Sequence, residues 1–183
     1  MMNSFLELVK KRASCRKYID KTIPEEIICY CLEAVQNTPS ACNKQPWRFI
    51  IVQEKELRSQ ICKKGLLPGI PMPWLQQAPI IVVICAETSF FTHKFASTLS
   101  GVKYHLIDIG IAGEHLVLAA ESKKLGSCWI GWFKEKQIKK ILSIPKNIKV
   151  LSLISLGYPA DNSYPAKKKS IDDFTYRNTW GSK

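Results

Sequence analysis

Apolar residues recur at helical spacing in two long stretches of the chain. The first begins at the capping pair Thr22 and Glu25, with Pro24 as an early helical residue. The second covers about residues 102–124 and is apolar on most sides, which predicts a long core helix that Gly126 terminates. Shorter helices are predicted over residues 4–12, 57–64 and 135–142.

Four apolar runs predict β-strands, at residues 47–52, 80–85, 128–130 and 150–156. The run at 80–85 is nearly all β-branched, which is typical of a strand buried on both faces. Residues 65–79 contain four prolines and are expected to form a loop. Alternating helices and strands alone would suggest a parallel sheet, but no glycine-rich dinucleotide fingerprint follows any strand.

The chain has 183 residues, which predicts one domain over residues 1–183. Apolar residues make up 46% and charged residues 23%, an ordinary globular composition that excludes disorder and collagen-like structure. No apolar run is long enough to span a bilayer, and the first residues lack the pattern of a secretion signal. We therefore expect a cytoplasmic protein with no membrane partner.

The 27 basic and 15 acidic residues give a net charge of +12, which is compatible with nucleic-acid binding. Only five of the basic residues are arginine, and the lysines occur singly or in pairs apart from Lys167–Lys169. Scattered lysines are typical of a solvated surface. We expect no nucleic-acid partner, although a basic nucleic-acid-binding module stays the alternative from a different functional class.

The seven cysteines are an odd number and contain no C-x-x-C pair. This spacing excludes zinc ribbons, ferredoxin-type clusters and thioredoxin-like redox pairs. The three histidines likewise lack the spacing of metal ligands. We expect no metal site, and most of the cysteines should be small buried hydrophobic residues in a reducing compartment.

Two segments carry groups suited to ligand binding. In the first, Arg12, Ser14 and Arg16 occupy alternate positions, so an extended backbone would project all three side chains to one side. Two guanidinium groups and a hydroxyl suit a phosphate or another planar anion, and an exposed basic linker is the alternative. The second, residues 39–47, is a proline-bounded loop rich in hydrogen-bonding side chains, for which a plain helix–strand connection is the alternative.

Together these segments resemble the FMN-dependent nitroreductase family. Its pattern R-x-S-x-R followed by an aromatic residue is matched by residues 12–16 and Tyr18. Its second pattern, roughly A-P-S-x-x-N-x-Q-P-W, is matched by residues 39–47, with Thr38 in place of the usual small residue. Further family-like segments follow the long helix in the expected order, at residues 125–131 and 156–159.

The resemblance covers nearly the whole chain and implies an α+β fold, with a mixed, largely antiparallel sheet flanked by helices. It also implies an intertwined homodimer with FMN at the interface. The implied activity passes electrons from NAD(P)H through the flavin to a nitroaromatic, a quinone or a similar small acceptor, and needs no catalytic side chain of the protein. A specialised flavin reductase or dehydrogenase on the same fold is the alternative.

The same resemblance implies the FMN-binding residues. Arg12 and Ser14, with Ala13 between them, would hold the phosphate and ribityl chain, and Arg16 would lie near the pyrimidine edge of the flavin. Arg177 is the candidate for a basic residue that reaches the phosphate from the carboxyl-terminal segment.

The remaining implied residues come from two other segments. In one, Ile130 and Gly131 would offer backbone N–H groups toward flavin N5, beside Trp129. The other would come from the partner subunit and comprises Pro39, Ser40 and Asn43, with Gln45 close by.

The electron acceptor and the choice between NADH and NADPH are not determined by the sequence. Residues 65–79, with Trp74, and the pair Phe90–Phe91 are candidates to line the substrate side, and ordinary loop packing is the alternative for both.

Overall fold

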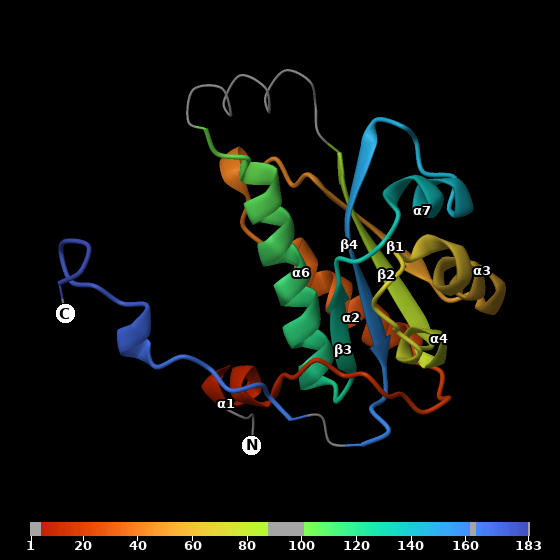
Figure 1. Ribbon diagram of the computed structural model, residues 1–183, viewed down its shortest axis with the longest axis horizontal. Helices are drawn as coiled ribbons and strands as arrows, with labels where there is room; N and C mark the ends of the chain where they lie inside the picture. The colour runs from red at the N-terminus through yellow and green to blue at the C-terminus, as the bar shows by residue number, and fades with distance from the viewer. Residues whose placement is uncertain (1–4, 88–100, 162–163, 183) are drawn as a thin grey trace.

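The computed structural model describes residues 5–87, 101–161 and 164–182. Four strands form one sheet in the order β1-β2-β4-β3, and all three pairings are antiparallel (Figure 1). Helices and sheet together give the expected α+β fold.

The helices are α1 (Phe5–Lys11), α2 (Glu25–Gln36), α3 (Lys55–Gln60), α4 (Trp74–Gln77), α6 (Tyr104–Ser122) and α7 (Glu135–Ile141). The strands are β1 (Trp47–Val52), β2 (Ile80–Glu87), β3 (Gly126–Ile130) and β4 (Ile148–Gly157), and the short helical turns are η1 (Ala41–Asn43), η2 (Ile61–Gly65) and η3 (Ile171–Asp173).

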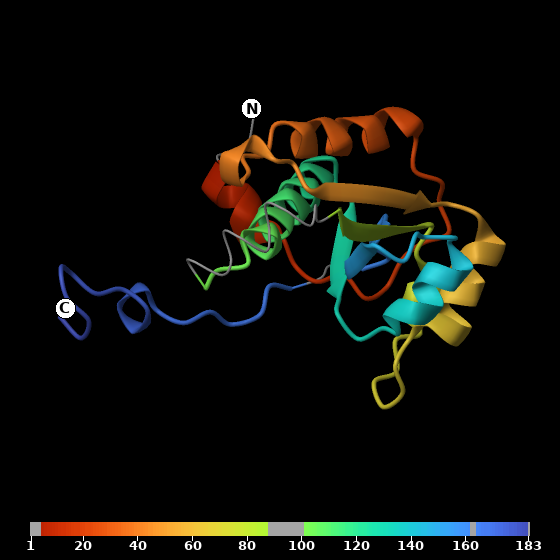
Figure 2. The same cartoon turned by 90° about the horizontal axis from the view of Figure 1, so that it is seen from above.

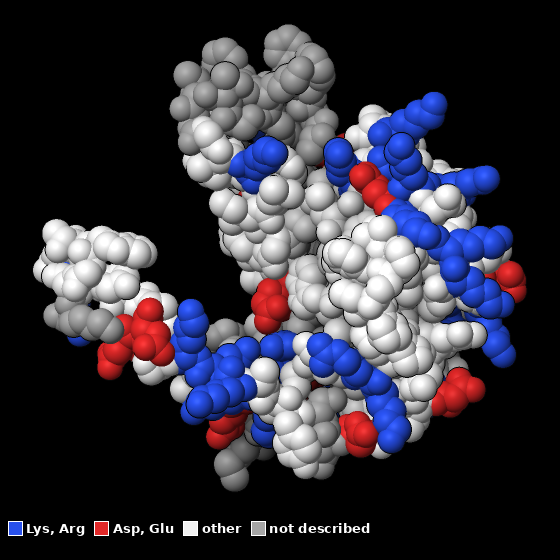
Figure 3. Space-filling model, in the orientation of Figure 1, with Lys and Arg blue, Asp and Glu red and all other residues white. Residues whose placement is uncertain are grey.

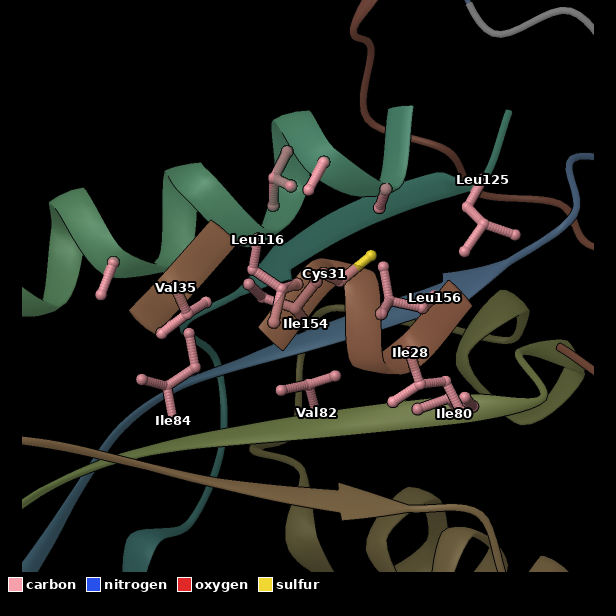
Figure 4. Close-up of a cluster of buried hydrophobic side chains, with 14 of the residues drawn as sticks. Ile28, Cys31, Val35, Ile80, Val82, Ile84, Leu116, Leu125, Ile154 and Leu156 are labelled. Carbon is pink, nitrogen blue, oxygen red and sulfur yellow. The ribbon is translucent and has the colours of Figure 1, made fainter. Parts of the chain in front are cut away.

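Strand β2 is buried on both faces, as its β-branched sequence predicts. Its even-numbered side chains pack with α2 and α6, and its odd-numbered side chains pack with η2, α4 and α7 on the other face. Figure 2 shows this layering of helices on both faces of the sheet. In the close-up of Figure 4, Val35 of α2 and Leu116 of α6 meet Val82 and Ile84 of the strand. The sheet therefore separates two large cores, and Cys15, Tyr18 and Ala78 form a third, small cluster.

The ends of two helices differ from the sequence prediction. Pro24 is extended (ψ 144°), so α2 begins only at Glu25 and no side chain caps its first turn. The left-handed residue that closes α6 is Lys124 (φ 62°) rather than Gly126. Gly126 instead begins β3, where it lies against Cys15.

Residues 65–79 are not a loop throughout, which corrects the sequence prediction. Helix α4 begins directly after Pro73, whose fixed φ suits the start of a helix, and it inserts Leu75 fully into the core. The helix predicted over residues 57–64 is also divided, into α3 and the π-type turn η2.

Several apolar residues lie on the surface. Leu106 and Ile107 were expected to lie in the core with the rest of the long helix, but about half of each is exposed. Helix α1 buries none of its residues. Residues 164–182 extend away from the body of the molecule, and Trp180 is 89% exposed (Figure 1). The Ser4 capping position and the pair Phe90–Phe91 lie outside the described residues.

Candidate functional site

The segment from Arg12 to Arg16 runs beside strand β3 in extended conformation. Ser14 forms a parallel bridge with Ser127, and the Cys15 N–H donates to the Ser127 carbonyl at 2.8 Å. Ala13 and Cys15 are buried, so the polar residues at positions 12, 14 and 16 face the other way, as the alternation predicts. The fold thus presents two guanidinium groups and one hydroxyl on one side of a fixed backbone.

Close packing fixes this segment from behind. A Cβ atom on Gly126 would lie 2.6 Å from both Cβ and Sγ of Cys15, so only glycine allows the approach. The Tyr18 hydroxyl donates to the Cys15 carbonyl at 2.9 Å and lies 2.7 Å from the Ser155 Oγ. Burial raises the pKa of Tyr18 well above its usual value, so this hydroxyl stays a neutral hydrogen-bond donor.

The two arginines have different surroundings. The Arg12 Nε lies 4.0 Å from an Oε of Glu114 on α6, and both side chains are partly exposed. The Arg16 guanidinium lies 5.7 Å from the centre of the Trp74 ring, within the range of a cation–π contact. The Trp74 Nε1 is buried without a hydrogen-bond partner among the described residues. An unpaired donor therefore stands next to Arg16.

The sequence analysis missed a thiol in this region. Cys128 is buried, which raises its pKa, while the positive charges of Arg16 and Arg12 and a hydrogen bond with Ser14 oppose that rise. Cys128 follows Ser127, the bridge partner of Ser14, and its thiol lies within electrostatic range of both arginines. Only the pairing of β3 with residues 12–16 reveals this, since no spacing in the sequence connects them.

The carboxyl end of β3 is the second part of the region. The Trp129 ring packs directly on α6, because a Cβ atom on Gly113 would lie 2.1 Å from its Cη2. Ile130 is buried in the core on the other face of the sheet. Gly131 is exposed, and a Cβ atom there would meet nothing within 4 Å. Open space therefore surrounds the backbone at Gly131.

The loop of residues 39–45 has an unusual backbone. Cys42, Asn43 and Gln45 all have positive φ, between 47° and 52°. For residues other than glycine this conformation costs about 1–2 kcal/mol each, less for asparagine. The Ser40 Oγ accepts from the Gln45 N–H at 2.9 Å, and the Gln45 Nε2 donates to the Asn43 Oδ1 at 2.8 Å. The predicted polar side chains of this loop thus contact one another.

The loop is joined to α6 by Asp108, which the sequence analysis did not single out. Its Oδ1 accepts from the Ala41 N–H at 3.0 Å. Asp108 is only 3% exposed, and its Oδ2 has no hydrogen-bond partner among the described residues. An acidic residue within an otherwise apolar helical run was the available signal.

One chain does not bring all the predicted residues together. The turn η1 lies near the amino end of α6, whereas the segment after α1 lies near its carboxyl end (Figure 1). Arg177 lies in the extended tail, where its backbone N–H donates to the Ser182 carbonyl at 2.9 Å. The residues at positions 12–16 and 129–131 therefore form one group, and the residues at positions 39–45 form another.

Basic side chains gather where the carboxyl-terminal segment passes in front of α1 and the segment after it (Figures 1 and 3). A second basic surface covers α7 and η2, which pack together and carry Lys63, Lys64, Lys136 and Lys140. Lysines that are scattered in the sequence are thus partly gathered by the fold.

A polar cleft of about 570 Å³ lies between the segment after Tyr18 and helices α3 and α4. It contains none of the residues predicted to bind FMN. Its lining residues are Tyr18, Asp20, Lys55, Glu56, Arg58, Ser59, Gln76 and Gln77.

All seven cysteines are free, and four of them are buried, which confirms that most act as small core residues. Within the described ranges, no three His, Cys, Asp or Glu side chains come close enough together to hold a metal ion. None of the helices described is both long and apolar enough to cross a membrane.

Comparison with known proteins identifies the family. The model of the nitroreductase family matches residues 9–69 and 66–158. The FMN reductase [NAD(P)H] of Bacillus subtilis is 32% identical over 182 residues, which cover 93% of this chain and 71% of the relative. The crystal structure of a nitroreductase family protein from Clostridium novyi superposes with a TM-score of 0.78 at 31% identity, over 98% of this chain and 96% of that one. An FMN-dependent nitroreductase from Clostridium difficile superposes with a TM-score of 0.80 at 25% identity, over 96% of this chain and 100% of that one. The chain belongs to the nitroreductase family of oxidoreductases.

Proposed function

We propose that this protein is an FMN-dependent oxidoreductase that transfers electrons from NAD(P)H to a small acceptor such as a nitroaromatic or a quinone. The observation that carries the proposal is the array of Arg12, Ser14 and Arg16 on one side of a segment fixed against β3. The names of the Bacillus subtilis and Clostridium difficile relatives support the cofactor and the electron donor. Seven free cysteines suit the reducing cytoplasm.

The residues present fit FMN. Arg12 and Ser14 supply a guanidinium and a hydroxyl for a phosphate and a sugar alcohol. The unpaired Trp74 Nε1 and the Arg16 guanidinium supply donors for the carbonyl oxygens of the pyrimidine edge. The open backbone at Gly131 leaves room for a planar ring. When bound, FMN supplies the hydride and electron transfer chemistry.

The chain's own residues would bind the cofactor and orient it. Arg16 would place a positive charge at the pyrimidine edge, where it would stabilise negative charge. The packing of Trp129 on Gly113 fixes the direction in which the backbone at Ile130 and Gly131 leaves the sheet. No side chain is required as a nucleophile or general base.

We also propose that the protein is a homodimer in which each site uses both chains. The two groups of predicted residues lie at opposite ends of α6 in one chain, so a second copy would bring residues 39–45 to the arginines. Exposed apolar side chains on α1, on α6 and in the tail support a partner surface, among them Phe5, Leu106, Ile107 and Trp180. The tail would also bring Arg177 to a phosphate of the partner.

Purification tests the proposal directly. The protein should carry FMN in stoichiometric amount, show the visible absorbance spectrum of oxidised flavin, and oxidise NADH or NADPH when an acceptor is added. Sedimentation should give a dimer. A colourless protein that takes up no FMN, yet binds DNA with a steep dependence on salt, would instead support the nucleic-acid alternative.

A further inference from the structure

The loop of residues 39–45 holds a conformation that its own sequence does not favour. Three of its residues other than glycine have positive φ, and such backbone persists only where surrounding structure fixes it. The side-chain hydrogen bonds of Ser40, Asn43 and Gln45 lie within the loop, and the Gln45 carbonyl accepts from the Arg48 guanidinium of β1 at 3.3 Å. Arg48 thus holds the carboxyl end of the loop, and its amino-terminal part needs an anchor of its own.

Asp108 supplies that anchor. Its Oδ1 accepts the Ala41 N–H at 3.0 Å, across 67 positions of sequence, at the start of the turn η1. This hydrogen bond joins the turn η1 to α6. Asp108 itself is 3% exposed and sits on the buried side of the helix, next to Ile109 and Ala112 of the core.

A carboxylate in this position is costly unless it does something that an apolar residue could not do. Its Oδ2 is buried and unpaired among the described residues, although buried polar atoms nearly always have partners. Leucine or alanine would remove this cost but would also leave the Ala41 N–H without its acceptor. The bond through Oδ1 is thus the feature that accounts for an aspartate at this place.

We propose that Asp108 is a positioning residue for cofactor binding: it fixes the loop that presents Ser40 and Asn43, and so sets the affinity for FMN without touching FMN. The inference rests on the proposed function, because the loop's role in FMN binding is part of that function. Asp108 lies near the end of α6 that is remote from Arg12. Its effect on FMN affinity should therefore be independent of the contacts that Arg12 makes with the phosphate.

Two substitutions separate the hydrogen bond from simple packing. Asp108→Ala removes the acceptor, and the dissociation constant of FMN, measured by titration of the apoprotein, should rise about tenfold, as for one hydrogen bond. Asp108→Asn keeps an oxygen for the Ala41 N–H and exchanges the unpaired Oδ2 for an amide NH2, so it retains the anchoring hydrogen bond and its affinity for FMN should stay within about threefold of the wild type. Ile138→Ala is the control for lost stability, because Ile138 is fully buried in the core on the other face of the sheet.

The FMN titrations of these variants either support or overturn the proposed role of Asp108. The inference is supported if Asp108→Ala weakens FMN binding more than Ile138→Ala does and Asp108→Asn restores it. It is overturned if Asp108→Ala binds FMN as tightly as the wild type, or if Asp108→Asn is as weak as Asp108→Ala. A wild-type protein that binds no FMN would overturn the proposed function and this inference together, so the two failures are distinguishable.

Discussion

The segment at residues 12–16 and the loop at residues 39–45 both carry predicted FMN-binding side chains, but the fold holds them in different ways. The first is extended and unstrained, paired to β3, with Ala13 and Cys15 packed beneath it. The second is a strained turn held by side chains, Ser40 within it and Asp108 outside it. The first should therefore respond mainly to changes in packing, and the second to the loss of single hydrogen bonds.

The largest loss of stability and of FMN affinity should come from crowding the Trp129 side chain of β3. Gly113→Ala would place a Cβ atom 2.1 Å from the Trp129 ring, so the indole must move and the free energy of unfolding should fall by roughly 1–3 kcal/mol. FMN affinity should fall with it. Urea unfolding and FMN titration measure both quantities.

Gly110→Ala is the matched control on the same helix, because its Cβ atom would meet nothing within 4 Å. It should leave stability unchanged or raise it by about 1 kcal/mol, since alanine favours helix. Equal losses in the two variants would show that the Trp129 contact is not what makes Gly113 necessary.

Substitution of the two arginines should have different effects: loss of Arg16 should change the flavin midpoint potential, and loss of Arg12 should change the affinity for FMN. A unit charge about 4 Å from the flavin at an effective dielectric of about 20 is worth roughly 4 kcal/mol. The exposure of Arg16 should reduce this to about 1–3 kcal/mol. Arg16→Met should thus lower the flavin midpoint potential by roughly 20–60 mV, because the reduced flavin is the more negative form. Potentiometric titration measures it.

Arg12→Met is the counterpart of that experiment. A phosphate contact sees little change of charge on reduction, so this variant should weaken FMN binding and leave the potential nearly unmoved. A shifted potential in Arg12→Met with none in Arg16→Met would reverse the two assigned roles.

A smaller effect should follow from loosening the loop. Ser40→Ala removes the acceptor of the Gln45 N–H and should reduce FMN affinity by about 1 kcal/mol, with little change in global stability. Thermal unfolding of the apoprotein together with FMN titration tests this. If stability fell as much as affinity, the loop would be part of the core structure rather than a unit held from outside.

The smallest effect should lie outside both regions, on α7. Burial alone would raise the pKa of Glu135, but hydrogen bonds from Lys139 and the Val150 N–H lower it. A lowered pKa contributes stability above the unfolded value of about 4.3 and loses it as pH falls through the folded value. Glu135→Gln should cost less than about 1 kcal/mol at pH 7, and this cost should shrink as the pH falls below the unfolded value and through the lower folded value. FMN affinity should not change, and a change there would show that α7 is coupled to the site.

The sequence predicted the first region better than the second, for a physical reason. Alternation of polar and buried residues is a local property, so the common direction of Arg12, Ser14 and Arg16 could be inferred from their spacing. The anchor Asp108 could not be inferred, because its partner Ala41 is 67 positions away. The strands and most helices were predicted from periodicity, since the core imposes it.

The errors in the fold prediction have similar causes. Glycine is common after helices, but here Lys124 takes the left-handed conformation, and Gly126 is needed for its contact with Cys15. Leu106 and Ile107 are apolar yet exposed, because apolar spacing predicts that a helix has an apolar face but not that the rest of the chain covers that face.

The order of strands in the sheet has a consequence for synthesis of the chain. Strand β2 lies between β1 and β4, and its residue Ile80 pairs with Leu156 near the end of the folded body. A chain emerging from the ribosome therefore exposes this edge of the apolar β2 until β4, the strand that pairs with it, has been translated. Folding should be slow and late, as it is for proteins dominated by contacts between distant residues. During that interval the unpaired edge of β2 is where the nascent chain is most exposed to aggregation, and where a chaperone would be of most use.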